Sequence, residues 1–250
     1  MEDLALHIPT DVIDGPTSLV TALIAALAVA WCTVAARRGP RPFSRSARAE
    51  GSDGGMDERL VPLAGLATAF IFAAQMLNFP IAAGVSGHLL GGALAAALLG
   101  PWLGALCVTV VIVIQALLFA DGAVTALGLN VANMALIATF TAYGVIALAL
   151  KVLPRTRWGL GAAVFAASVV SVVAASAGFV LQFWIGGEPV GQSFGAIAGA
   201  ILGTHVLVGI GEGVITAGAV TAVALARPDL VHALRGTPLA KPAPALKEAR

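Results

Sequence analysis

His88 is the side chain whose type and position most clearly offer chemistry. It follows an apolar run that carries Gln75 and Asn78, and it comes directly after a Gly-Val-Ser-Gly turn sequence at 84–87. Proline ends or kinks a helix and glycine permits tight backbone, so the proline-containing stretch 72–92 is expected to form two helices joined by a compact polar turn. An imidazole there suits Co, Ni, Cu or Zn. The alternative is a histidine that caps a helix by hydrogen bonding a carbonyl.

A second imidazole, His7, lies in a short acidic segment that could fold back to the same side of the membrane as His88. Alone, it would be an ordinary solvated histidine; the two together favour a metal site. Uncharged polar side chains lie near the outer ends of neighbouring helices and could either bridge helices or orient a ligating histidine. They are Gln75, Asn78, Asn130 and Asn133. Asp121, followed by glycine, most simply ends a helix, with a ligand role as the alternative.

His205 and Glu212 are seven residues apart, which places them two turns apart on one helix face. An ionisable residue within a membrane span is costly and usually faces the interior or a cavity. The pair could form a second metal site or a proton relay. It could instead be a structural hydrogen bond or ion pair that ties the last helix to the bundle, and this is the simpler interpretation. Gly209 and Gly213 form a GxxxG pair that indicates close helix contact.

A rival of another class is an intramembrane serine protease. Ser86 lies in a GxSG pattern like that of rhomboid-like proteases, and His205, on a later helix, could activate it. Against this interpretation, Ser86 follows only two expected spans, and the adjacent His88 has no part in such chemistry.

The composition predicts an all-α integral membrane protein. Of the 250 residues, 59% are hydrophobic and 11% are charged, against about 25% charged in soluble domains. Both cysteines fall in apolar runs, so neither a disulfide framework nor a cysteine zinc site is expected. Seven membrane helices are expected, at 17–36, 60–79, 88–99, 102–120, 130–151, 159–184 and 204–226, with 194–203 as an interfacial approach to the last.

The charges predict an orientation. With seven spans and the N-terminus outside, all 14 lysines and arginines lie on the cytoplasmic side, as the positive-inside rule requires. The expected organisation is an extracytoplasmic segment at 1–16 that contributes a metal ligand, a seven-helix membrane domain at 17–226, and a basic cytoplasmic tail at 227–250 that is flexible.

Four long motifs carry a family resemblance. FAAQMLNFP, SGHLLGGALAAALLGPW, QALLFADGAVTALGLNVANM and HVLVGIGEGVIT resemble successive signatures of the CbiM/NikM substrate-binding subunits of cobalt and nickel energy-coupling factor transporters, from His7 to about Ala226. The resemblance implies a multi-pass subunit of the bacterial plasma membrane that captures Co²⁺ or Ni²⁺ as its transported ligand, in the case of cobalt for cobalamin biosynthesis. It implies no enzyme activity and no nucleic-acid binding.

The same resemblance implies the partners. A transmembrane coupling subunit of the CbiQ/NikQ type and ATPase subunits of the CbiO/NikO type would drive uptake, and a small CbiN/NikN-type protein often accompanies them. ATP is therefore expected only on the partner subunits.

The resemblance also implies nitrogen ligands: the terminal amine, the amide and imidazole of the second residue, and the histidine of the SGHLLGG motif. His7 and His88 match the two imidazole positions, with Gln75, Asn78, Ser86 and Asn130 around them. This chain departs from the pattern because Met1 to Leu6 precede His7. Our hypothesis is that Leu6 initiates translation as methionine, which mass spectrometry of the native N-terminus tests. Because ligating imidazoles must be neutral, uptake is expected to fall below about pH 6.

Overall fold

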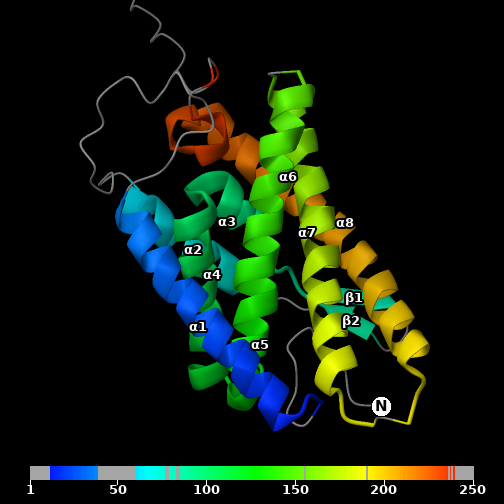
Figure 1. The fold of residues 1–250 in the computed structure, drawn as a ribbon. Coiled ribbons are helices and arrows are strands. Elements are labelled where there is room, and N and C mark those ends of the chain that lie inside the picture. Colours follow the sequence, from blue (N-terminus) through cyan, green and yellow to red (C-terminus); the bar gives the residue numbers. More distant parts are fainter. Residues whose placement is uncertain are drawn as a thin grey trace, which may run out of the picture.

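The fold is a bundle of apolar helices, shown in Figure 1. The computed structural model describes residues 12–38, 60–76, 79–82, 85–154, 156–189, 191–235, 237 and 239. The elements are α1 (Gly15–Arg37), α2 (Leu60–Gln75), β1 (Phe79–Ala82), β2 (Val85–Gly87), α3 (Gly92–Leu99), α4 (Pro101–Leu118), α7 (Arg157–Gly186) and α8 (Phe194–Ala226). Between α4 and α7, one helical rod runs through η2 (Val124–Ala126), α5 (Leu127–Asn130), the π-helical η3 (Val131–Ile137) and α6 (Ala138–Val152). Two short turns follow α8, η4 (Pro228–Leu230) and η5 (His232–Leu234).

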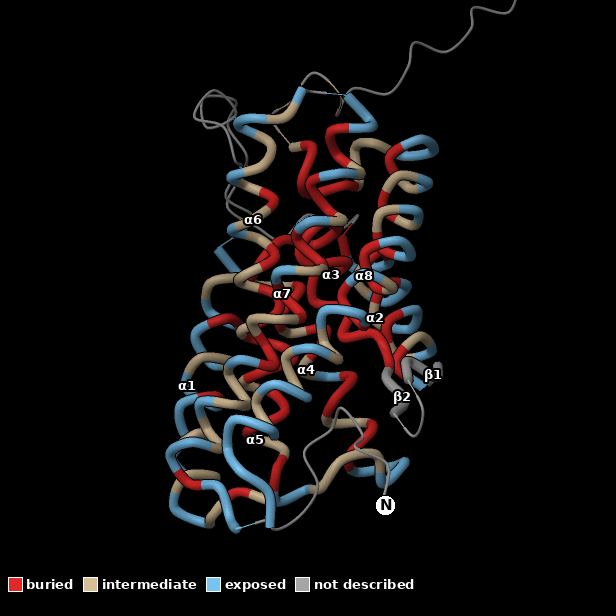
Figure 2. The backbone as a smooth tube through the Cα atoms, turned by 90° about the vertical axis from the view of Figure 1, so that its right-hand side faces the viewer, coloured by how far each residue is buried: buried red, intermediate tan, exposed pale blue. Residues whose placement is uncertain are grey.

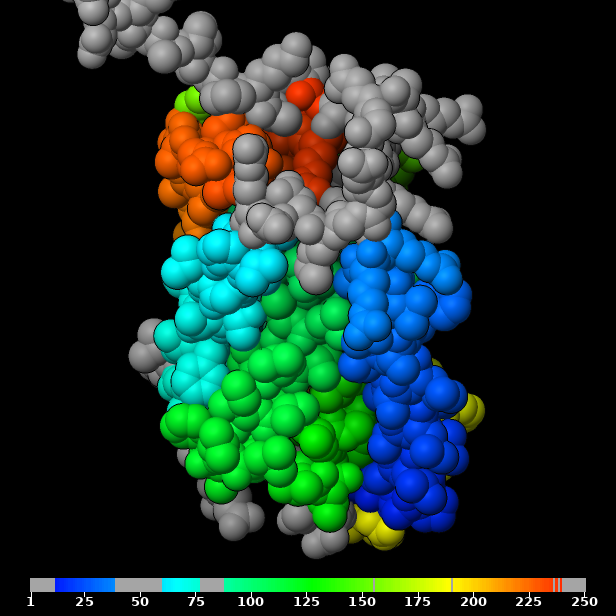
Figure 3. Space-filling model, turned by 90° about the vertical axis from the view of Figure 1, so that its left-hand side faces the viewer, coloured from blue at the N-terminus to red at the C-terminus, as the bar shows by residue number. Residues whose placement is uncertain are grey.

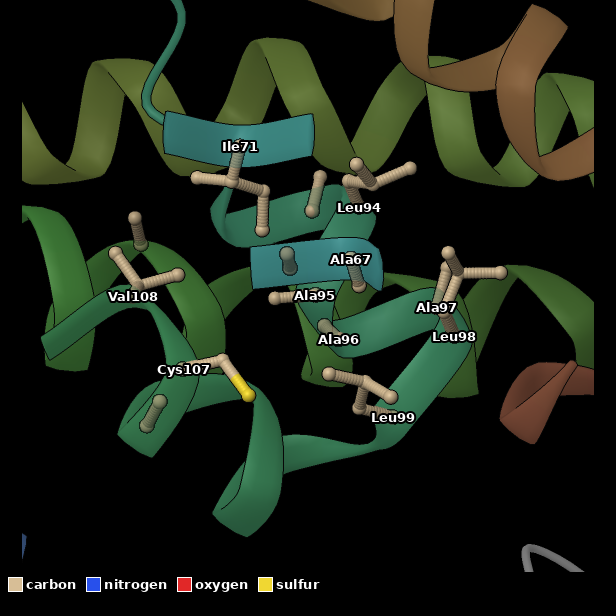
Figure 4. Packing of buried hydrophobic residues seen from close by; sticks show 14 of the residues in the cluster. Ala67, Ile71, Leu94, Ala95, Ala96, Ala97, Leu98, Leu99, Cys107 and Val108 are labelled. Atoms are coloured by element: carbon tan, nitrogen blue, oxygen red, sulfur yellow. The ribbon is translucent and has the colours of Figure 1, made fainter. Parts of the chain in front are cut away.

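The centre of the bundle is α3, in which all eight residues are buried. Its sequence is GALAAALL, and the small side chains let neighbouring helices approach closely. A Cβ at Gly92 would lie 2.8 Å from the Cβ of Ala138, and one at Gly104 would lie 2.9 Å from the backbone of Ala95. Figure 2 shows the buried residues running through the middle of the molecule, and Figure 4 shows α3 packed with residues of α2 and α4. Close contacts with neighbouring helices on several sides therefore hold α3 in position.

Outer helices expose apolar side chains, as membrane spans do. Leu27 of α1 is 73% exposed and Trp158 at the start of α7 is 89% exposed. Figure 3 shows one such face, with α1 in blue, α2 in cyan and the green surface of the following helices between them. Such surface is stable when lipid covers it. Among the described residues, five helices are long and apolar enough to cross a membrane, while α2 is a shorter apolar helix of 16 residues.

The helix boundaries around the predicted turn at 72–92 were wrong. α2 ends at Gln75, and 79–87 contains an antiparallel ribbon in which Pro80 pairs with Ser86. The third helix begins at Gly92 and not at His88, and at about 1.5 Å per residue its eight residues extend only about 12 Å. It is too short to cross the bilayer alone. The seven-span count therefore stays a prediction.

Two other expectations also need correction. Residues 194–226 form one helix, α8, and not an interfacial segment followed by a span, since no proline interrupts the run and Ser193 caps its start. The tail after Arg227, expected to be flexible, is folded at its beginning. Residues 231–234 of that tail are buried beside the end of α3, because the apolar side chains of Val231 and Leu234 pack into the main hydrophobic cluster.

α7 and α8 pack closely through the predicted GxxxG pair. A Cβ on Gly209 would lie 3.0 Å from the Cα of Val169, and one on Gly213 would lie 2.7 Å from the ring of Phe165. The expected close helix contact is confirmed. α8 is thereby held along its middle, where Glu212 projects into the bundle.

Candidate functional site

His88 lies in a short stretch that is neither helix nor strand, between β2 and α3. We call residues His88–Gly91 the histidine segment. The His88 side chain is 3% exposed, and its Nδ1 is 2.9 Å from the carbonyl oxygen of Leu89. A carbonyl can only accept a hydrogen bond, so in this arrangement Nδ1 carries the proton and Nε2 of the neutral ring carries the lone pair. The histidine does hydrogen bond a carbonyl, but it does not cap a helix.

The peptide groups of Leu90 are held from two sides. Its N–H donates to Glu212 Oε2 at 2.7 Å, and its carbonyl accepts from Gln75 Nε2 at 2.6 Å. Gly91 N–H donates to the other carboxylate oxygen, Glu212 Oε1, at 3.2 Å. Glu212 is 0% exposed and Gln75 is 1% exposed. Side chains from α2 and α8 therefore fix the backbone of the histidine segment inside the bundle.

Gly91 gives the segment its connection to α3. Its φ of 78° is in the left-handed region, which L side chains rarely adopt, and it immediately precedes the helix. A Cβ at this position would lie 2.7 Å from Cγ2 of Ile71 in α2. The chain can therefore turn from the histidine segment into α3 only through a glycine.

The predicted pair on α8 has separate partners. His205 Nδ1 is 2.7 Å from the carbonyl oxygen of Ile201, one turn earlier in the same helix. Glu212 binds the backbone of the histidine segment, as described above. The glutamate thus ties α8 to the bundle, as the structural interpretation supposed, but its partners are backbone N–H groups and not the histidine.

Two of the predicted asparagines, Asn130 and Asn133, lie in the rod between α4 and α7. Asn130 and Asn133 are both buried. The amides of Asn133 and Gln182 exchange two hydrogen bonds, with N···O distances of 2.8 and 3.0 Å. Gln182 was not predicted as a site residue, although an amide within the long apolar run of α7 is itself a signal of an interior polar contact.

Gln115 of α4 is a buried amide that was also not predicted as a site residue. Its Nε2 is 3.9 Å from the sulfur of Met76, at the end of α2. Asp121, in the loop after α4, is partly buried.

Some of the predicted site residues fall outside the part of the chain that the structure describes. His7 and Asn78 lie outside the described residues, and for Ser86 only its backbone position in β2 is described. Within the described ranges, no three His, Cys, Asp or Glu side chains gather closely enough to hold a metal ion. The chain enters the described region at Val12, five residues after His7. Five residues span at most about 18 Å.

Val12 and its neighbours are anchored at the end of α7. Asp14 N–H donates to the Gly186 carbonyl at 2.7 Å, and Glu188 N–H donates to the Val12 carbonyl at 3.0 Å. The side chain of Asp14 also caps α1 by accepting from Thr17 N–H at 2.9 Å. Hydrogen bonds from the side chain and the backbone N–H of Thr17 lower the pKa of the Asp14 carboxyl. The segment that precedes α1 therefore starts from a fixed point.

Comparison with known proteins gives a consistent result. Residues 7–230 match the family model CbiM, described as a cobalt uptake substrate-specific transmembrane region. The chain is 43% identical over 179 residues to the putative fused nickel transport protein NikMN of Archaeoglobus fulgidus, covering 70% of this chain and 57% of that protein. It is 37% identical over 183 residues to the cobalt transport protein CbiM of Sorangium cellulosum, covering 72% of this chain and 80% of that one.

Solved structures share the fold. A crystal structure of a transition metal transporter has 26% sequence identity and a TM-score of 0.71, covering 89% of this chain and 94% of that chain. A truncated transition metal transporter has 29% identity and a TM-score of 0.67. The chain spans little more than half the length of the fused archaeal relative.

Proposed function

This chain belongs to the CbiM family of cobalt-uptake transmembrane regions, and from that premise we propose that it is the subunit that captures Co²⁺ or Ni²⁺ for an energy-coupling factor importer. The relatives named above are cobalt and nickel transport proteins. The chain is a multi-pass membrane protein by its apolar helices. In the proposal, the ion binds at the extracytoplasmic side and passes inward with the partner subunits.

The observation that carries the proposal is the setting of His88. A neutral imidazole is a common ligand for these ions, and this one is buried in a segment whose backbone is fixed by Gln75 and Glu212. His7 is proposed as the other imidazole ligand, on a tether that starts from the anchored Val12. Asn78, Ser86 and Asn130 are proposed to surround the ion and orient its ligands.

The partners are part of the proposal. A coupling subunit and cytoplasmic ATPases would supply the work of uptake, so that this chain hydrolyses no ATP itself. The name of the fused archaeal relative joins a NikM part to a NikN part, which supports a small NikN-type partner for this chain. We place the complex in the bacterial plasma membrane, with the N-terminus outside and the C-terminus in the cytoplasm.

The test is the Co and Ni content of the purified subunit. The parent is expected to retain one of the two ions, and His88→Ala is expected to lose it while still inserting in the membrane. His205→Ala is the matched control, because His205 is a partly buried imidazole of α8 that hydrogen bonds its own helix. This control should keep the ion. Equal metal content in the parent and His88→Ala would refute the site.

The protease alternative gains no support from the relatives, which are named as transport proteins. That alternative predicts instead that Ser86→Ala abolishes cleavage of a membrane substrate and leaves metal affinity unchanged.

A further inference from the structure

The histidine segment is held at two successive peptide units by residues far apart in the chain. Glu212 comes 122 positions after Leu90, and Gln75 comes 15 positions before it. Together they take up the N–H and the C=O of the same residue, and Glu212 takes up the next N–H as well. Such a clamp constrains both the position and the rotation of the backbone that follows His88.

We propose that Glu212 is a positioning residue for the metal site, acting through the backbone of the histidine segment to hold the His88 imidazole in its binding position. This inference rests on the proposed function, since it assigns Glu212 a role in ion affinity. Glu212 itself does not contact the ion. Gln75 assists from the opposite side.

The backbone of the histidine segment needs hydrogen-bond partners from outside the segment. Residues 88–91 belong to no helix or strand. The Gly91 carbonyl accepts from Ala95 N–H of α3 at 3.0 Å, but the N–H groups of Leu90 and Gly91 are not paired by regular structure. Within a membrane protein there is no bulk water to pair them, and an unpaired buried backbone group is costly. The Glu212 carboxylate is suited to the task because both its oxygens only accept, and two N–H groups face it.

The partner of the two N–H groups is a carboxylate and not a neutral amide. Burying a carboxylate is expensive unless hydrogen bonds compensate for the lost hydration, and a neutral amide could have satisfied one of these N–H groups. A carboxylate satisfies both, with stronger charge-assisted bonds. The gain is a fixed backbone, which removes the ordering cost that a mobile histidine would incur on binding an ion. Loss of such supporting contacts typically weakens metal affinity about 10–100-fold.

Two substitutions each change a hydrogen-bond partner of the Leu90 backbone. In Glu212→Gln, one oxygen becomes an NH₂ group, which presents a donor to a backbone donor, so one of the two bonds is lost with little change in volume. Gln75→Glu has the converse effect, since it faces a carboxylate oxygen toward the Leu90 carbonyl. Because both changes act on Leu90, their effects on ion affinity are expected to be non-additive in the double variant.

A matched control separates positioning from general loosening. Gln182→Leu removes the two hydrogen bonds between Gln182 and Asn133, which join α7 to η3 and involve no residue of the histidine segment. It also breaks polar contacts between helices that are partly buried, so it reports the effect of a weakened bundle alone.

The experiment titrates the purified full-length subunit with Ni²⁺ and measures hydrogen exchange of the Leu90 and Gly91 amides without metal. Glu212→Gln is expected to weaken Ni²⁺ binding 10–100-fold and to speed exchange at these two amides. Gln182→Leu should bind Ni²⁺ like the parent. Glu212→Asp, which keeps the charge, provides the second variant should Glu212→Gln fail to fold. Its Ni²⁺ affinity should lie between that of the parent and that expected for Glu212→Gln.

The outcomes separate the two proposals. If the parent binds Ni²⁺ and Glu212→Gln binds it equally well, the positioning role is wrong while the proposed function stands. If Glu212→Gln and Gln182→Leu weaken binding alike, general loosening explains the effect and the positioning role is again wrong. If the parent binds neither Ni²⁺ nor Co²⁺, the proposed function fails, and the role assigned to Glu212 fails with it.

Discussion

Gly91 shows how a single residue couples the site to the core. Its positive φ lets the chain pass from the histidine segment into α3, and its missing side chain leaves room for Ile71. The same residue donates its N–H to Glu212. Backbone conformation, core packing and the clamp on the histidine segment therefore meet at one position.

Replacing Gly91 by alanine is predicted to destabilise the protein. The left-handed conformation costs an L residue about 1–2 kcal/mol, and the new Cβ would lie 2.7 Å from the Ile71 side chain. We expect a lower free energy of unfolding in detergent by at least that amount. Gly218→Ala is the control: a Cβ there meets nothing within 4 Å inside α8, so it should be neutral or stabilising by up to about 1 kcal/mol. Equal stability of the two variants would contradict the prediction.

Single residues also show the limits of prediction from sequence. Glu212 could be recognised as an interior residue because a carboxylate in an apolar helix rarely faces lipid. Its partners could not be predicted, because they are backbone N–H groups of a distant segment and carry no side-chain signature. The expected partner, His205, instead bonds the carbonyl of Ile201 in its own helix.

Among the elements, the long apolar helices were the most predictable. α1 begins two residues before the expected span and ends one residue after it, because length and hydrophobicity alone identify such helices. The stretch 72–92 was not predicted correctly. Proline and glycine indicated a break there, but they do not distinguish a tight turn from the short ribbon that Phe79 and Pro80 form with 86–87.

The start of α3 illustrates the same limit. Sequence pattern alone would extend the helix back to His88, since leucine has a high helix propensity. The hydrogen bonds from Leu90 and Gly91 to Glu212 stabilise the non-helical alternative. Tertiary contacts of this kind override local propensity.

The turns after α8 form an element that no motif predicted. His232 is buried, and its ring lies against Gly100, where a Cβ would be 2.8 Å from the ring. The ring centroid is 6.2 Å from that of Tyr143 in α6. Burial, helped by the positive charge of Arg235, lowers the pKa of His232 to about 3. The folded tail thus requires a neutral histidine.

Stability is therefore predicted to depend on pH through His232. Its pKa is 6.5 in an ordinary setting and about 3 here, so between these values the unfolded tail binds a proton that the folded tail excludes. The contribution of His232 to the free energy of unfolding is fully present above about pH 6.5. It falls with decreasing pH, by about 1.4 kcal/mol per pH unit. Denaturation of the parent and of His232→Leu at pH 7.5 and 4.5 measures this. The variant should lose less stability than the parent on acidification; equal losses would contradict the assignment.

The ends of α1 and α7 place acidic residues at one end of the bundle and arginines at the other. Residues 12–14 hold the start of α1 against the end of α7, so Asp14 and Glu188 share one end of the bundle. α1 and α7 run away from that end toward Arg37 and Arg157, as Figure 1 shows. This agrees with the charge pattern used to predict orientation from sequence. Which end faces the cytoplasm stays a prediction.

Labelling of single cysteines can determine the orientation. The positive-inside rule places the arginine end in the cytoplasm, so Glu188→Cys should react with a membrane-impermeant maleimide in intact cells, while Arg157→Cys should react only after permeabilisation. The native Cys32 and Cys107 are buried and should give little background, which the unmodified chain verifies. A reversed pattern would put the acidic end inside the cell. It would also place the anchored Val12 and the tether to His7 on the cytoplasmic side, which is incompatible with ion capture from outside.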